Sequence, residues 1–135
     1  MHRDIRPESV LVFSTQEDDE GVLSFADLGV QFKLAHLHEA RYLREDEQTD
    51  ERTGDVEYCA PERLYSEPYN YKADLWALGC LYYRLMVGFV PFQASAVKPM
   101  DVVTKLSEQF QKGFYFIPRS LNLPPTVLTN LQNLL

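Results

Sequence analysis

The feature that most constrains this chain is the apolar stretch of residues 73–87, the longest in the sequence. Its apolar side chains form two adjacent stripes at helical spacing, one of Leu75, Leu78, Tyr82 and Leu85 and the other of Trp76, Cys80, Tyr83 and Val87. A helix that is apolar on nearly every side is usually buried, so we expect a central buried helix over 73–87. Asp74 lies in its first turn, where a carboxylate suits the helix dipole. A carboxylate beside a buried segment needs hydrogen-bond donors, and Asp74 therefore predicts a specific partner elsewhere.

Length and charge narrow the class of protein. The 135 residues suffice for one domain with one hydrophobic core. The net charge of −7 argues against a nucleic-acid partner and against binding to anionic membranes. The two cysteines, Cys59 and Cys80, are too few for a disulfide scaffold. Because the start also lacks an apolar leader segment, we expect an intracellular, cytoplasmic protein.

The first half of the chain predicts a short β-hairpin. Val10–Phe13 and residues 22–26 are apolar runs of strand length, separated by a polar loop. Residues 17–20 of that loop are all acidic, but their spacing lacks the pattern of a calcium loop, and we interpret them as solvated. From residue 30 to 57 the chain is charged and irregular, which predicts a surface segment.

The second half predicts helices. A short helix is expected near residues 63–65, and Gly88 followed by Pro91 predicts the end of the central helix. Apolar residues at helical spacing predict a helix over 100–111, and the same spacing recurs over 126–135. The predicted fold class is therefore mainly α with one short β-hairpin, in a single unit.

Five motifs, in order along the chain, resemble those of eukaryotic protein kinases. Residues 2–9, His-Arg-Asp-Ile-Arg-Pro-Glu-Ser, resemble the catalytic-loop motif H-R-D-x-K-P-E-N, and residues 27–29, Asp-Leu-Gly, resemble D-F-G. Residues 54–62 resemble the G-T-x-x-Y-x-A-P-E end of the activation segment. Residues 74–79 resemble the start of the long buried helix of the large lobe, and 88–92 resemble the turn after it.

The resemblance covers nearly the whole chain. It implies that residues 1–135 are a partial kinase domain of the serine/threonine type, namely the large, C-terminal lobe from the catalytic loop onward with the small lobe absent. It implies the catalytic loop at 1–9, the activation segment at 27–62, the central buried helix at 73–87 and C-terminal helices in 100–135.

The resemblance also implies the chemistry of the site. Asp4 would orient a substrate hydroxyl and accept its proton, and Arg6, where the family usually has a lysine, would contact the γ-phosphate. Asp27 would bind Mg²⁺, while Ser9 stands where an asparagine normally binds a second metal ion and braces the loop. The implied cofactors are ATP and Mg²⁺, the implied partner is a protein substrate, and ATP binding requires that a small lobe be supplied.

Several acidic and basic residues have implied supporting roles. Arg3 is expected to pair with an anion of the activation segment, and Glu51 occupies the position of the usual phosphosite. We hypothesise that the Glu51 carboxylate replaces a phosphate; Thr49 and Thr53 are alternative phosphosites, and a merely solvated acidic patch is the alternative interpretation.

Three further carboxylates are singled out by the same resemblance. Asp55 replaces the family's usual threonine and would repel Asp4 unless the two share a proton or a cation. Glu62 normally pairs with a downstream arginine, and no Arg or Lys follows Arg119 here. Asp74 is expected to accept hydrogen bonds from the backbone N–H groups of the catalytic loop around His2 and Arg3.

Two functions remain open from sequence alone. The first is part of an active serine/threonine kinase, favoured by Asp4, Arg6 and Asp27. The second is a pseudokinase or truncated kinase fragment that acts, if at all, as a binding module; Ser9, Asp55 and the expected absence of the small lobe favour it. An unrelated helical binding module would explain none of the five motifs. Sequencing the transcript upstream of the Met1 codon for a glycine-rich loop and a strand lysine separates the first two.

Overall fold

The computed structural model describes residues 1–13, 30–94, 101–113, 117–118 and 121–135. The strands and α-helices within these ranges are β1 (Val10–Phe13), β2 (Gln31–Leu34), α1 (Pro61–Leu64), α2 (Lys72–Val87), α3 (Val102–Lys112) and α4 (Pro125–Leu134). Short 3-10 helices, η1 (Pro7–Ser9), η2 (Leu37–Glu39) and η3 (Val56–Tyr58), lie in the connecting segments. The expectation of a mainly helical fold with a small hairpin is confirmed, and the three longer helices lie within two residues of their predicted bounds.

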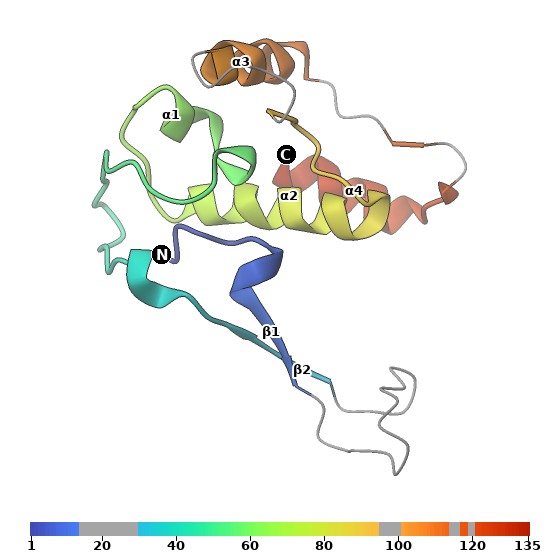
Figure 1. The fold of residues 1–135 in the computed structure, drawn as a ribbon, viewed down its shortest axis with the longest axis horizontal. Coiled ribbons are helices and arrows are strands. Elements are labelled where there is room, and N and C mark those ends of the chain that lie inside the picture. The colour runs from blue at the N-terminus through green and yellow to red at the C-terminus, as the bar shows by residue number, and fades with distance from the viewer. Residues whose placement is uncertain (14–29, 95–100, 114–116, 119–120) are drawn as a thin grey trace.

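The hairpin differs from the prediction in its second strand. β1 begins and ends as predicted and pairs antiparallel with β2, with Val10 opposite Leu34 and Phe13 opposite Gln31. The predicted partner, residues 22–26, lies outside the described residues, whereas β2 belongs to the segment that we expected to be irregular. The alternating polar and apolar residues of β2 are a strand pattern, but four residues inside a charged segment give a weak signal. Figure 1 shows the hairpin extending away from the helices.

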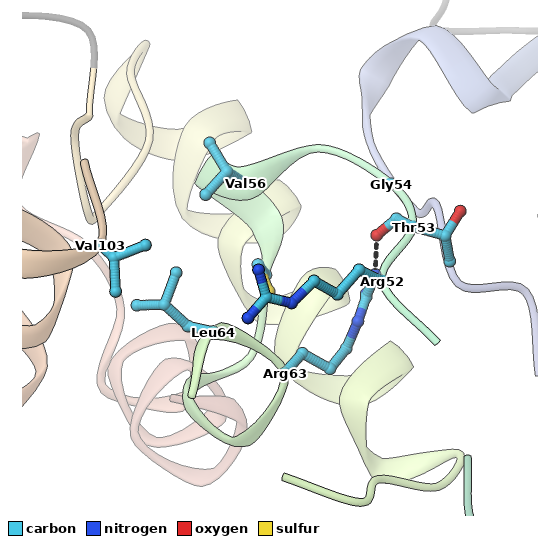
Figure 2. Close-up of a pocket in the computed structure, with 8 residues that line it drawn as sticks. Arg52, Thr53, Gly54, Val56, Arg63, Leu64 and Val103 are labelled. Carbon is cyan, nitrogen blue, oxygen red and sulfur yellow. Dashed lines mark hydrogen bonds between the residues drawn. The ribbon is translucent and has the colours of Figure 1, made fainter. Parts of the chain in front are cut away.

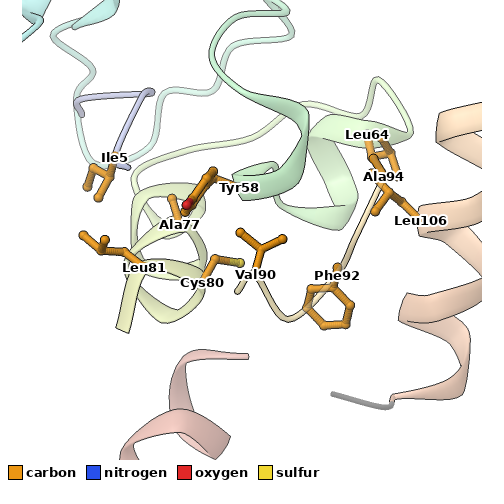
Figure 3. Packing of buried hydrophobic residues seen from close by; sticks show 10 residues of the cluster. All are labelled: Ile5, Tyr58, Leu64, Ala77, Cys80, Leu81, Val90, Phe92, Ala94 and Leu106. Carbon is orange, nitrogen blue, oxygen red and sulfur yellow. The ribbon is translucent and has the colours of Figure 1, made fainter. Parts of the chain in front are cut away.

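The hydrophobic core is organised around α2. The side chains of Cys80 and Tyr83 on this helix are fully buried. Trp76 of α2 stacks on Phe92 with ring centroids 5.4 Å apart, and Phe110 of α3 meets Phe92 edge-on at 4.8 Å. These aromatic contacts join α3 to α2 through the segment that follows Gly88. Figure 3 shows the buried cluster, which consists of Ile5, Tyr58, Leu64, Ala77, Cys80, Leu81, Val90, Phe92, Ala94 and Leu106.

The prediction that α2 is buried on every side is wrong. Leu75, Leu78 and Leu85, from one of its two apolar stripes, are 47%, 42% and 67% exposed. α4 packs against a different line of the helix, where a Cβ on Gly79 would lie 2.8 Å from the Cβ of Leu134. The spacing of apolar residues shows that a face of the helix is apolar, but it does not show which element covers that face. In the described ranges no element covers the stripe of Leu75, Leu78 and Leu85 fully.

The predicted end of the central helix is confirmed, because Gly88 takes a left-handed backbone conformation at the C-terminal end of α2. Gly113 takes the same kind of conformation at the C-terminal end of α3. Both cysteines are free thiols. In the described part of the chain no helix has the length and apolar character needed to cross a membrane.

Candidate active site

The loop of residues 2–9 is tied to the first turn of α2. The Asp74 carboxylate accepts hydrogen bonds from the backbone N–H of His2 at 2.6 Å and from that of Arg3 at 2.8 Å. These are the donors that the sequence predicted, and the bond to His2 joins residues 72 positions apart. The His2 ring braces the same loop, because its Nδ1 accepts from the Asp4 N–H at 3.3 Å while its Nε2 lies 2.8 Å from the Ala35 carbonyl oxygen.

Arg3 is held in an unfavourable backbone conformation. Its φ angle is +71°, in the left-handed region, which costs a residue other than glycine about 1–2 kcal/mol. The hydrogen bond from its N–H to Asp74 and another from its Nε to the Glu39 carbonyl oppose relaxation. Strained residues of this kind persist where the surrounding structure fixes them, and they cluster at functional sites.

Asp4 and Arg6 form the centre of the site. Asp4 is buried, and the Arg6 Nε lies 3.2 Å from each of its two carboxylate oxygens. The Arg6 Nη1 lies 3.7 Å from Oδ2 of Asp55, whose Oδ1 accepts the N–H of Glu57 at 2.9 Å and caps η3. The repulsion expected between Asp4 and Asp55 is therefore offset by a shared cation. Together with Gly54 and two residues of η2, these side chains line a pocket of about 270 Å³.

On the segment that neighbours this loop, the Glu51 carboxylate bridges two arginines. Its Oε2 accepts from Arg3 Nη1 at 2.6 Å and its Oε1 from Arg41 Nη1 at 2.7 Å. The hydrogen bond from Arg3, followed by the charge of Arg41, holds the pKa of the Glu51 carboxyl below its usual value. The backbone is fixed as well, since Thr49 and Tyr69 exchange two hydrogen bonds of 2.9 Å and the Tyr69 hydroxyl donates to the Glu51 carbonyl at 2.6 Å. Arg41 and Tyr69 were not predicted, because no local pattern marks them.

At Gly54 the segment before η3 lies close against this loop. Its φ is +75°, and a Cβ at this position would lie 2.5 Å from the Arg3 carbonyl oxygen. The same Cβ would lie 3.4 Å from Asp4 Oδ1 and 3.4 Å from Arg63 Nη2. The backbone contact leaves no room for a side chain, so the close approach requires glycine.

Gly54→Ala is expected to destabilise the chain by more than about 2 kcal/mol, because the left-handed backbone alone costs about 1–2 kcal/mol and the clash with Arg3 adds to it. Gly113→Ala is the matched control, since Gly113 has φ +60° and nothing within 4 Å of its Cβ position. Urea unfolding followed by circular dichroism measures both. Equal losses in the two variants would contradict the close approach at Gly54.

Comparison with known proteins shows the family. The family model for the protein kinase domain matches residues 1–134. The chain belongs to the protein kinase family. Over its whole length the chain is 30% identical to the DNA damage response protein kinase DUN1 of Saccharomyces cerevisiae. It is 31% identical, again over its whole length, to the serine/threonine-protein kinase ATG1 of Debaryomyces hansenii.

A further relative is the G protein-coupled receptor kinase 1 of Caenorhabditis briggsae, 32% identical over 83% of the chain. The chain spans 16%, 27% and 15% of the lengths of the receptor kinase, DUN1 and ATG1. The resemblance to eukaryotic protein kinases of the serine/threonine type is thus confirmed at the level of the family.

The metal ligands expected of a kinase are not assembled in the described part of the chain. Ser9 is fully buried, and its hydroxyl donates to the Arg6 carbonyl at 2.8 Å and accepts from the Arg6 N–H at 3.0 Å. These bonds brace the loop but do not fit direct metal binding. Asp27 lies outside the described residues. Among the residues described, no group of three or more His, Cys, Asp or Glu side chains could hold a metal ion.

The two free cysteines differ in burial: Cys59 is half-buried and Cys80 is buried. Burial raises the pKa of the Cys59 thiol and, more strongly, that of the Cys80 thiol. A raised pKa disfavours the thiolate, which is the form of cysteine that acts as a nucleophile or a metal ligand.

Arg63 is a structural residue that the sequence did not predict. The preceding Glu62 has no ion-pair partner among the described residues, whereas Arg63 is buried and donates from Nη1 to the Arg3 carbonyl at 3.3 Å and from Nη2 to the Thr53 carbonyl. Its guanidinium lies 5.0 Å from the centre of the Tyr69 ring. Arg63 therefore joins α1 both to the loop of residues 2–9 and to the segment that contains Thr53.

Proposed function

We propose that this lobe is the phosphoryl-transfer part of a serine/threonine protein kinase, which in the whole protein moves the γ-phosphate of ATP to a hydroxyl of a protein substrate. The observation that supports the proposal is a buried carboxylate, Asp4, on a loop tied to α2 by Asp74, with the Arg6 guanidinium beside it at the pocket. Phosphoryl transfer requires mainly a positioned hydroxyl and neutralised phosphate charge. In this proposal Asp4 positions the hydroxyl and Arg6 neutralises phosphate charge.

In this proposal each described residue has one task. Asp4 orients the attacking hydroxyl and accepts its proton on a carboxylate oxygen. Arg6 presents its guanidinium to the phosphate, and Asp55, at 3.7 Å, keeps it at the pocket. Bound Mg²⁺ would neutralise further phosphate charge, with Asp27 as the proposed ligand.

Transfer of radiolabelled phosphate from ATP to a serine- and threonine-containing protein, with Mg²⁺ or Mn²⁺, tests the proposal. The full-length gene product is expected to show transfer. The 135-residue chain alone is expected to show little or none, because it carries no glycine-rich phosphate loop and the phosphate-positioning groups act together. Failure of the full-length product to transfer phosphate would contradict the proposal.

The alternative, a pseudokinase or kinase fragment that acts as a binding module, is favoured by one observation. The Ser9 hydroxyl, which stands at a metal-binding position in the family, is buried and engaged within its own loop. A protein with this function would bind partners with an ordered lobe but would transfer no phosphate. The phosphate-transfer assay therefore separates the two functions.

We further propose that the protein acts in the cytoplasm. Both of its cysteines are free, which is typical of a reducing compartment. Microscopy of the tagged full-length protein tests this, and secretion into the medium would contradict it.

The Glu51 carboxylate is proposed to act as a permanent substitute for an activating phosphate. Glu51→Ala is expected to speed backbone hydrogen exchange at residues 49–51 and to lower the activity of the full-length kinase, because Arg3 and Arg41 lose their shared anion. Since the pKa of this carboxyl is lowered in the fold, its contribution is present above the usual value of 4.5 and disappears as the pH falls through the lower folded value. The protection of these amides, taken relative to the intrinsic exchange rate at each pH, should therefore fall at acidic pH.

Asp50→Ala is the matched control for Glu51, because this neighbouring acid is exposed and has no ion pair among the described residues. Unchanged activity in Glu51→Ala, or equal loss in both variants, would show that residues 50 and 51 are a solvated acidic patch.

A further inference from the structure

Arg63 is a buried cation without a carboxylate partner in the described part of the chain. It is only 7% exposed, and none of the ion pairs among the described residues includes it. Its Nη1 donates to the Arg3 carbonyl at 3.3 Å and its Nη2 to the Thr53 carbonyl, while its buried Nε has no hydrogen-bond partner in those ranges. A buried charge normally pairs with an opposite charge, so this arginine depends on the positions of the two carbonyls.

The two carbonyls belong to segments that are far apart in the sequence. Arg63 follows Arg3 by 60 positions and Thr53 by 10. Figure 2 shows the Arg63 side chain reaching from α1 to Thr53. A guanidinium is planar and its donors have a fixed spacing, so hydrogen bonds from both Nη atoms fix one carbonyl relative to the other.

An aromatic ring holds the guanidinium itself in place. The guanidinium carbon of Arg63 lies 5.0 Å from the centroid of the Tyr69 ring, within the range of a cation–π interaction. Tyr69 is buried, and its hydroxyl donates to the Glu51 carbonyl at 2.6 Å. Because the ring is fixed at both its face and its hydroxyl, Arg63 offers the two carbonyls a pair of donors in a fixed place.

The Arg3 carbonyl belongs to the peptide group that leads into Asp4. A peptide group is planar, so the direction of this carbonyl also sets the direction of the Asp4 N–H. Arg63 holds the oxygen of the group at 3.3 Å, and His2 Nδ1 accepts from its N–H at 3.3 Å. The Arg3 N–H is fixed as well, by its hydrogen bond of 2.8 Å to Asp74. The backbone that carries the Asp4 side chain is therefore held from both sides.

The nearness of Arg63 to Asp4 allows two kinds of action. The Cβ position of Gly54 lies 3.4 Å from Asp4 Oδ1 and 3.4 Å from Arg63 Nη2, so these two atoms lie within twice that distance of each other. Arg6, at 3.2 Å, is the cation that contacts the carboxylate. Arg63 acts on Asp4 either by its charge across the gap or through the backbone that it holds, and only the second action requires two donors at a fixed spacing.

We propose that Arg63 is a positioning residue for phosphoryl transfer. Its two hydrogen bonds fix the peptide group before Asp4 against the segment at Thr53, and this keeps the Asp4 carboxylate where the substrate hydroxyl gives up its proton. A misplacement of about 1 Å at a reacting group can cost about 10²-fold in rate, so a residue that does not touch the substrate controls the rate through Asp4. This inference rests on the proposed function.

Phosphate transfer by the full-length kinase tests the inference through kcat and the KM for ATP. Arg63→Met keeps much of the buried stem but has no donor, and kcat is expected to fall about 10- to 100-fold while the KM changes by less than about twofold. Arg63→Lys keeps the charge but has no planar pair of donors, so its kcat should stay at least about fivefold below that of the wild type.

Leu64→Ala is the matched control for these variants. Leu64 is the next residue of α1 and is equally buried, at 7%, but its side chain has no hydrogen-bonding atom. The substitution should lower the urea midpoint by leaving a cavity, yet keep kcat per folded molecule within about twofold of the wild type. A purely structural role of Arg63 predicts the same kcat in both variants.

A measurement on the wild-type 135-residue chain tests the contact even where Arg63→Met fails to fold. In ¹⁵N NMR spectra the Nη signals of Arg63 should be resolved and slow to exchange with water, because both nitrogens donate to carbonyls. Arg44 is exposed, and its Nη signals should be averaged and exchange fast.

The outcomes that overturn the positioning role leave the proposed function in place. They are a wild-type kcat in Arg63→Met, a change in KM alone, full recovery in Arg63→Lys, an equal fall of kcat in Leu64→Ala, and Nη signals of Arg63 as averaged as those of Arg44. A wild-type full-length protein that transfers no phosphate would contradict the proposed function itself, and with it the role of Arg63.

Discussion

Replacing Asp74 by asparagine is expected to lower the free energy of unfolding by about 2–4 kcal/mol. The carboxylate accepts two backbone hydrogen bonds, of 2.6 and 2.8 Å, from His2 and Arg3. Bonds to a charged acceptor are each worth about 1.5–3 kcal/mol, and asparagine offers one oxygen while turning a donor toward the second N–H. The loss also frees Arg3 to leave its left-handed backbone conformation. Urea unfolding of the chain, followed by circular dichroism, measures the difference.

Asp101→Asn is the matched control for this experiment. This substitution is the same chemical change at the start of another helix, α3. The Asp101 side chain is exposed and forms no cap hydrogen bond. Should Asp74→Asn fail to fold, wild-type hydrogen exchange supplies the second measurement, with the amides of His2 and Arg3 among the most protected outside the helices. Equal stability of the two variants, or rapid exchange of those two amides, would contradict the role of Asp74 as an anchor.

The sequence predicted the contact between Asp74 and the backbone of the loop at His2, because these two parts of the chain lie in separate motifs of one family. Helical periodicity likewise located α2 within one residue, since the pattern of apolar side chains repeats over four turns. It did not predict that Leu85 would be 67% exposed, because burial depends on which other element packs there. The pairing of β1 with β2 was missed for a related reason, as register depends on the partner strand and not on β1 itself.

The candidate site was predictable where a residue acts through its own motif and not where it acts through a distant contact. Asp4 and Arg6 lie two positions apart, so their proximity follows from the chain itself. The sequence showed that Asp55 needed a cation, and only the fold identified Arg6 as that cation. Arg41 reaches Glu51 across ten positions of irregular chain, for which no periodic pattern exists.

Asp4→Asn in the full-length kinase is expected to lower the rate of phosphate transfer by about 10²–10⁴-fold, the usual contribution of a positioned general base. Asparagine has nearly the same shape but cannot take the proton of the hydroxyl. The fold should be affected much less than the rate, because the asparagine carbonyl oxygen can still accept a hydrogen bond from the Arg6 Nε. The prediction is therefore a large fall in rate at nearly constant stability.

Two measurements on the same variants make that prediction specific. Radiolabelled phosphate transfer gives the rate, and the urea midpoint of each protein shows whether it remains folded. Asp46→Asn, at an exposed acid far from Asp4 in sequence and absent from the wall of its pocket, removes the same charge and should keep both the rate and the midpoint. If Asp4→Asn retained more than about a tenth of the wild-type rate, the loss would be smaller than a general base supplies. Asp4 would then not be the proton acceptor, and the anchored loop would serve binding.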